Sequence, residues 1–84
     1  MFDKNEIEEK LSSTEYDIFI TSERISSQKN YLAVLEKYGG DITEAKKLLA
    51  VAIETLYVMQ VYKEYLLYKL NIFYANEKNK YFFH

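Results

Sequence analysis

The sequence predicts an all-α protein, either a helical hairpin or a small three-helix bundle with a long C-terminal helix. The chain's only two glycines stand together in Gly39-Gly40-Asp41, and proline is absent from all 84 residues. Glycine adopts the left-handed conformation that ends many helices, and aspartate caps the start of the next one. We therefore expect residues 1–84 to form one helical domain that folds back at this turn.

The residues before the turn are predicted to form two segments. Residues 1–11 are expected to be a short acidic helix with its apolar side chains on one side. Ser12-Ser13-Thr14-Glu15 has the spacing of a capping box, which predicts the start of a first arm over residues 12–38. The middle of this arm is polar, and Ser26-Ser27 favours a break there. The sequence is compatible with either one helix or two helices over residues 12–38.

The residues after the turn at 39–41 predict one long helix over residues 41–75. Asp41 and Glu44 repeat the capping-box spacing at its start. Apolar residues then alternate at intervals of three and four, which is typical of helices that pack along one another. They are Ile42, Ala45, Leu49, Ala52, Leu56, Met59, Leu66, Leu70 and Phe73. Residues 76–84 form a polar and then aromatic tail, either frayed or acting as a latch through Tyr81-Phe82-Phe83.

The composition argues against most catalytic chemistry. Cysteine is absent, and the one histidine is the terminal His84, so no thiolate site, catalytic triad or histidine-based zinc site can be assembled. No nucleophile-elbow, P-loop or dinucleotide-binding glycine motif is present. We therefore predict that the chain is not an enzyme and that it holds no cofactor and no metal.

A membrane span is not expected. The strongly apolar stretch, residues 48–62, is interrupted by Glu54 and is followed at once by Lys63-Glu64. A span requires about 20 predominantly apolar residues, and a carboxylate at the bilayer centre is costly. The first residues also lack the basic start and apolar run of a signal peptide. Together with the absence of cysteine, this favours a cytoplasmic protein.

The unequal lengths of the two arms predict an interaction surface. A helix over residues 41–75 extends about 50 Å, whereas residues 12–38 cover at most about 40 Å of it. Either residues 1–11 fold back over the uncovered end or another chain covers it. The residues expected to anchor a partner there are Tyr62, Tyr65, Leu66, Leu70 and Phe73. Tyrosine suits such a role because it buries a large ring while its hydroxyl keeps a polar contact.

The function predicted from these features is a small protein–protein interaction module that acts by helix packing on a protein partner, a homo-oligomer or both. Residues 1–44 carry ten acidic and five basic side chains, while residues 45–84 carry three and six. This asymmetry fits attraction between antiparallel helices, or an acidic face for a basic partner. The architecture resembles small helical chaperones of type III secretion and small phage-encoded inhibitors, which implies an adaptor, chaperone or phage-type inhibitor or regulator.

Residues 31–57 also resemble the Fis-type helix-turn-helix. The resemblance rests on a leucine-rich helix, the Gly39-Gly40 turn, Thr43-Glu44-Ala45 and Thr55-Leu56-Tyr57 at matching spacing. It covers about a third of the chain. This family resemblance implies an alternative function, a DNA-binding regulator whose recognition helix contains Thr55-Leu56-Tyr57.

The chain departs from that family where DNA would be contacted. Ala50 stands at the turn glycine and Ala52 at the serine that caps the recognition helix. Ile53 and Glu54 occupy the usual arginine positions. Phosphate contacts require lysine or arginine, and a glutamate repels phosphate. Together with a net charge of -2, these substitutions make nucleic acid an unexpected partner.

Overall fold

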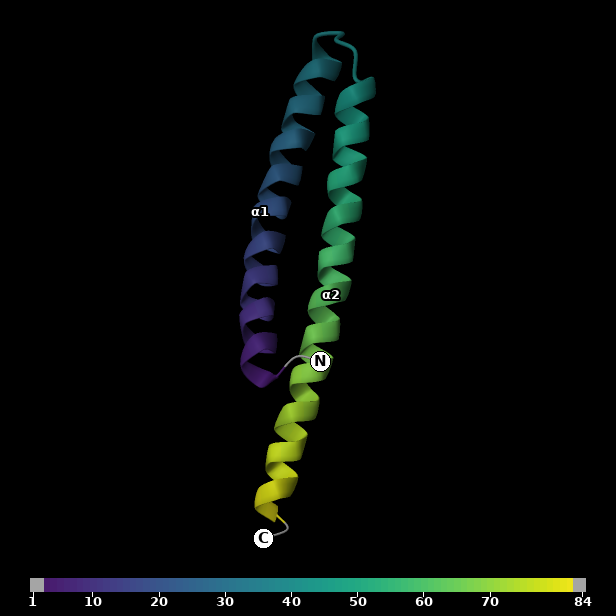
Figure 1. Cartoon of the computed structure of the whole chain (residues 1–84). Helices are drawn as coiled ribbons and strands as arrows, with labels where there is room; N and C mark the ends of the chain where they lie inside the picture. Colours follow the sequence, from purple (N-terminus) through teal and green to yellow (C-terminus); the bar gives the residue numbers. More distant parts are fainter. Residues whose placement is uncertain (1–2, 83–84) are drawn as a thin grey trace.

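The computed structural model is a two-helix hairpin (Figure 1). It describes the backbone of residues 3–82 and the side chains of residues 3–77. Helix α1 spans Lys4–Lys37 and helix α2 spans Thr43–Phe82. The helices run antiparallel, side by side, in a rod of 71 × 16 × 16 Å, and α2 continues past the start of α1 (Figure 1). The predicted helical hairpin is thus confirmed, and the three-helix bundle is wrong.

Helix α1 is continuous through the boundary that we expected between residues 11 and 12 and through Ser26-Ser27, where a break was left open. Its N-cap is Asp3, whose carboxylate accepts a hydrogen bond from the Glu6 backbone N–H at 2.8 Å. Residues 4–11 therefore belong to α1 and do not form a separate helix, and Ser12 lies inside α1 instead of capping its start. No break occurs at Ser26-Ser27, because both serines are exposed and the inward positions around them continue the helical spacing.

The inward face of α1 follows a seven-residue repeat that includes polar side chains. Beyond its first turn, the residues on this face alternate at intervals of three and four, as in a coiled-coil seam. They are Ile7, Leu11, Thr14, Ile18, Thr21, Ile25, Gln28, Leu32 and Leu35. Thr14 and Thr21 are buried at this seam. The polar middle of the first arm is thus part of the interface, which explains why the helix does not break.

The turn confirms the role predicted for glycine. Gly39 has φ +74°, the left-handed conformation in which a side chain is strained. The Gly40 N–H donates to the Leu35 carbonyl at 2.9 Å, and the Gly39 N–H donates to the Glu36 carbonyl at 3.4 Å. These two hydrogen bonds form a Schellman motif, which satisfies carbonyls at the end of α1.

Helix α2 begins two residues later and ends later than predicted. The Asp41 carboxylate accepts a hydrogen bond from the Thr43 backbone N–H at 3.0 Å, so Asp41 does stabilise the start of α2. The helix then continues to Phe82, through most of the region we expected to be a tail. The proposed latch through Tyr81-Phe82-Phe83 lies outside the residues whose side chains are described.

The best-buried part of the rod lies far from the turn. Ile7 and Leu66 are almost completely inaccessible to solvent, and Leu70 joins them, with Leu11 and Phe73 packed alongside. An ion pair between Lys4 and Glu77, with Nζ and Oε1 3.0 Å apart, closes this end of the hairpin. An exposed ion pair of this kind contributes little to stability, so the apolar cluster is the main stabilising element here.

Candidate protein-docking surface

The structure divides the five predicted anchors into two groups. Leu66, at 0% exposure, and Leu70 belong to the buried cluster, and Phe73 packs against it. The residues that cover them are the first turns of α1, because α1 begins at Lys4 instead of Ser12. Of the two covers considered for this end of α2, coverage by the chain's own N-terminal segment is the one observed, through Ile7 and Leu11 of α1. Leu66 and Leu70 are thus buried within the hairpin, and Phe73 is half-buried beside them.

Tyr62 and Tyr65 remain accessible, with exposures of 37% and 46%. Their rings stack with centroids 6.3 Å apart and planes inclined by 21°. The Lys69 ammonium lies 5.6 Å from the centroid of the Tyr65 ring, within cation–π range. The stacked pair therefore presents two aromatic rings side by side on one face of α2.

Both tyrosines belong to a longer row of residues on α2, which we call the exposed α2 stripe. Its members recur at alternating intervals of three and four residues. They are Leu48, Val51, Thr55, Val58, Tyr62, Tyr65, Lys69 and Ile72. At about 1.5 Å per residue the stripe extends about 36 Å. Its six apolar members are all exposed, with Val58 reaching 64%.

The two polar members of the exposed α2 stripe do not interrupt its apolar character. The Thr55 hydroxyl donates a hydrogen bond to the Val51 carbonyl at 2.8 Å, so its polar group is satisfied within the helix. Lys69 lies along the Tyr65 ring, and its methylene groups can cover apolar surface while the ammonium stays in water. The stripe is therefore a continuous apolar surface with one charge.

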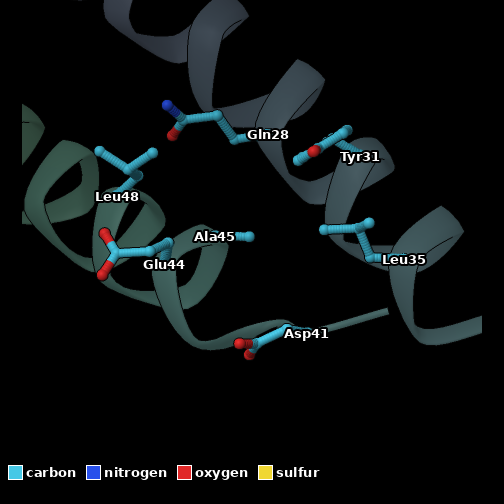
Figure 2. A pocket seen from close by; sticks show the side chains of 7 residues that line it. All are labelled: Gln28, Tyr31, Leu35, Asp41, Glu44, Ala45 and Leu48. Carbon is cyan, nitrogen blue, oxygen red and sulfur yellow. The ribbon is translucent and has the colours of Figure 1, made fainter. Parts of the chain in front are cut away.

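A hollow of about 180 Å³ adjoins the end of the stripe nearest the turn. Its lining comes from both helices and includes Tyr31 and Leu35 of α1 and Ala45 and Leu48 of α2 (Figure 2). The Gln28 amide points across the interface toward α2 (Figure 2), and its Oε1 atom is buried with no hydrogen-bond partner. The hollow shows that the two helices are less completely packed here than at the Ile7–Leu66 end.

Two exposed groups, Asp41 and Lys4, have a shifted pKa. The hydrogen bond from the Thr43 backbone N–H lowers the pKa of Asp41. The hydrogen bond to Glu77 raises the pKa of Lys4, whose Nζ also lies 4.9 Å from the centroid of the Tyr74 ring. In the part of the chain that the structure describes, no group of three or more His, Asp or Glu side chains could hold a metal ion.

Two further predictions can be compared with α2 directly. The Fis-type resemblance implied a turn near Ala50, ahead of a recognition helix. Helix α2 passes through Ala50 and Ala52 without interruption, so the two-helix arrangement of that motif is not formed there. Neither helix, over the described residues, has a stretch long and apolar enough to cross a bilayer.

Sequence reasoning missed most of the exposed α2 stripe. Leu48, Val51, Val58 and Ile72 were not among the predicted anchors, although they follow the same three-and-four spacing as Tyr62 and Tyr65. The available signal was a second repeat on α2, rotated about 100° around the helix from the inward seam.

Comparison with known proteins identifies no relative of this chain. No protein-family model matches the chain, and no curated protein and no solved structure matches it either. The function must therefore be argued from the residues and from the hairpin.

Proposed function

We propose that this chain is a helical protein–protein interaction module, an adaptor, chaperone or regulator that acts by helix packing. The observation that carries the proposal is the exposed α2 stripe, an apolar surface about 36 Å long outside the hairpin's own interface. Large continuous apolar patches on a protein surface mark interaction sites, because water contact with them is unfavourable. A helix laid along the stripe would bury alternating side chains at helical spacing.

The stripe also has the residue types that contribute most to protein interfaces. Tyrosine is enriched at contacts because it has few rotatable bonds and pairs a large ring with a polar hydroxyl. The Tyr62–Tyr65 stack places two such rings side by side on the stripe. Val58, one turn before Tyr62, and Val51, further along the stripe toward the turn, add stiff, branched side chains.

Site-specific photo-crosslinking in the cell tests this proposal. A photoreactive amino acid would replace Val58 on the stripe or Asn71, which is exposed on the opposite side of α2. We expect Val58, and not Asn71, to yield covalent adducts with a protein, either a second copy or another chain. The absence of adducts at Val58, or equal yields at both positions, would contradict a docking role for the stripe.

A further inference from the structure

We propose that the partner of the exposed α2 stripe is a second copy of this chain, paired antiparallel, stripe against stripe, about a twofold axis beside residue 60. This inference rests on the proposed function and names the partner. A twofold contact requires a surface that is complementary to itself when reversed. The stripe meets this requirement in the spacing, size and charge of its side chains.

The sizes of the side chains along the stripe favour a reversed pairing. The half nearer the turn contains the smaller Val51, Thr55 and Val58, and the far half contains the larger Tyr62, Tyr65 and Lys69. Reversal about residue 60 places each small residue opposite a large one on the second copy. The opposed pairs are Leu48 with Ile72, Val51 with Lys69, Thr55 with Tyr65, and Val58 with Tyr62. Alternation of large and small residues across a contact allows close packing without voids.

A parallel pairing of the same stripe is unfavourable. It would place Tyr62 and Tyr65 against their own copies and leave the valine half underpacked. It would also bring the two Lys69 ammonium groups together at a contact that excludes water. Like charges so placed repel each other and disfavour the contact. The sequence of the stripe therefore distinguishes the two orientations.

Charge complementarity supports the antiparallel register. In this register Lys69 of the second copy lies opposite Val51. Glu54 is exposed one turn along α2 from Val51, on the flank of the stripe. The carboxylate of Glu54 is thus the acidic group within reach of the second copy's Lys69, and the twofold axis repeats the pair at the other end of the contact.

The angle between the two apolar surfaces of α2 determines the shape of the dimer. The exposed α2 stripe lies about 100° around the helix from the seam that packs against α1. Two hairpins joined through their stripes therefore bring both copies of α1 to the same side, at the corners of a square. The expected assembly is a four-helix bundle. Tyr31 and Val34, exposed on the side of α1 that adjoins Leu48, would flank its centre.

The mass in solution is the first test. Light scattering over a concentration series should give twice the 10.0 kDa of one chain. Val58→Lys should raise the dissociation constant about a hundredfold or more, because two lysines enter the contact. Tyr57→Lys changes the adjacent residue, which is similarly exposed at 67% but lies off the stripe, and it should leave the mass unchanged. Far-UV circular dichroism of each variant verifies that the hairpin is folded.

Disulfide trapping tests the orientation, and the natural chain has no cysteine to interfere. Val51→Cys and Lys69→Cys would be prepared separately with tags of different size, mixed and mildly oxidised. An antiparallel contact centred on residue 60 gives predominantly the mixed disulfide, which joins position 51 of one copy to position 69 of the other. A parallel contact joins each variant to its own copy instead, because positions 51 and 69 are then about 27 Å apart along the axis.

The outcomes separate this inference from the proposed function. A dimer with the mixed disulfide supports it. A concentration-independent monomer overturns it, as does a dimer that gives only like disulfides or that Val58→Lys leaves intact. If the chain is a monomer while Val58 in the cell still crosslinks to another protein, the stripe is a docking surface for a different partner and only the second-copy inference fails.

Discussion

Thr21 and Met59 meet across the middle of the hairpin, where the Thr21 hydroxyl donates to the Met59 sulfur at 3.6 Å. Thr21 is buried, so its hydroxyl is removed from water in exchange for a weak acceptor. This contact shows that the polar middle of α1 is packed against α2 and is not a break between helices.

Thr21→Val should stabilise the hairpin by about 0.5–1 kcal/mol. The substitution keeps the shape of the side chain and replaces a buried, weakly bonded hydroxyl by a methyl group. Chemical denaturation followed by circular dichroism at a fixed protein concentration measures the effect. Thr21→Ala is the matched variant, and it should destabilise the hairpin because it removes packing volume. Destabilisation by Thr21→Val would mean that the Met59 contact is stronger than a sulfur acceptor normally provides.

Gln28→Leu should also stabilise the hairpin, by about 1–3 kcal/mol. The Gln28 Oε1 atom is buried without a hydrogen-bond partner, and its neighbours in the hollow include Leu35, Ala45 and Leu48. Leucine removes the unsatisfied acceptor and adds apolar contact. Thermal denaturation provides the measurement, with Lys29→Leu at the exposed neighbouring position as the control. A melting temperature that is unchanged or lowered in Gln28→Leu would contradict this account of the hollow.

Gly39→Ala should destabilise the hairpin by about 1 kcal/mol. Gly39 has φ +74°, and an alanine in the left-handed region places its Cβ atom against the backbone. Gly39→Asn should cost less, because asparagine tolerates this conformation better. Denaturant midpoints of the three proteins give the comparison. Equal stability of Gly39→Ala and the natural chain would show that the turn relaxes to another conformation.

The ionised carboxylate of Asp41 should stabilise the hairpin above pH 4, and this stabilisation should be lost at much lower pH. Its pKa is lowered in the folded chain by the Thr43 N–H, so the unfolded chain binds protons first as the pH falls. The contribution is therefore complete above the unfolded value of about 3.9 and is lost as the pH falls through the lower folded value. Asp41→Asn keeps an acceptor oxygen without titrating, so the stability difference between the two proteins should shift in favour of Asn below pH 4. Urea denaturation at pH 6 and pH 3 tests this; a difference independent of pH would contradict it.

Leu66→Ala and Leu67→Ala should differ strongly although the residues are adjacent. Leu66 is fully buried against Ile7, so its truncation should cost about 2–5 kcal/mol. Leu67 is 38% exposed, so its truncation should lower the free energy of unfolding by less than about 1 kcal/mol. Denaturation at one fixed concentration compares them. Similar losses at both positions would indicate that the helices pair in a different rotation from the one observed.

The candidate site was only partly predictable, and the reason is physical. Tyr62 and Tyr65 were predicted as anchors because tyrosine is typical of interfaces, and the structure leaves both exposed. Leu66, Leu70 and Phe73 were assigned to the same role because their apolar character was clear. Apolar character favours burial but does not specify which segment or chain covers the residue. Here the first turns of α1 cover these three residues.

The start of α1 illustrates a signal that the sequence did contain. Asp3 and Glu6 have the same spacing as a capping box, and Asp3 is the N-cap that the helix uses. Ser12-Ser13-Thr14-Glu15 has that spacing too, but it lies within a helix already begun. Local patterns can indicate several starts, and the choice between them depends on which one lets the helix bury Ile7 and Leu11.

The sequence by itself determined the helical class, the position of the bend and the inward seam of α2. These features follow from local causes: the left-handed preference of glycine at Gly39, the carboxylate of Asp41 and the spacing of apolar residues. Tertiary structure alone decided that α1 is a single helix, which end of α2 it covers, and which apolar residues of α2 remain in water. Those outcomes depend on contacts between residues more than fifty positions apart, such as Ile7 with Leu66, and no local pattern specifies the rotation of one helix against another.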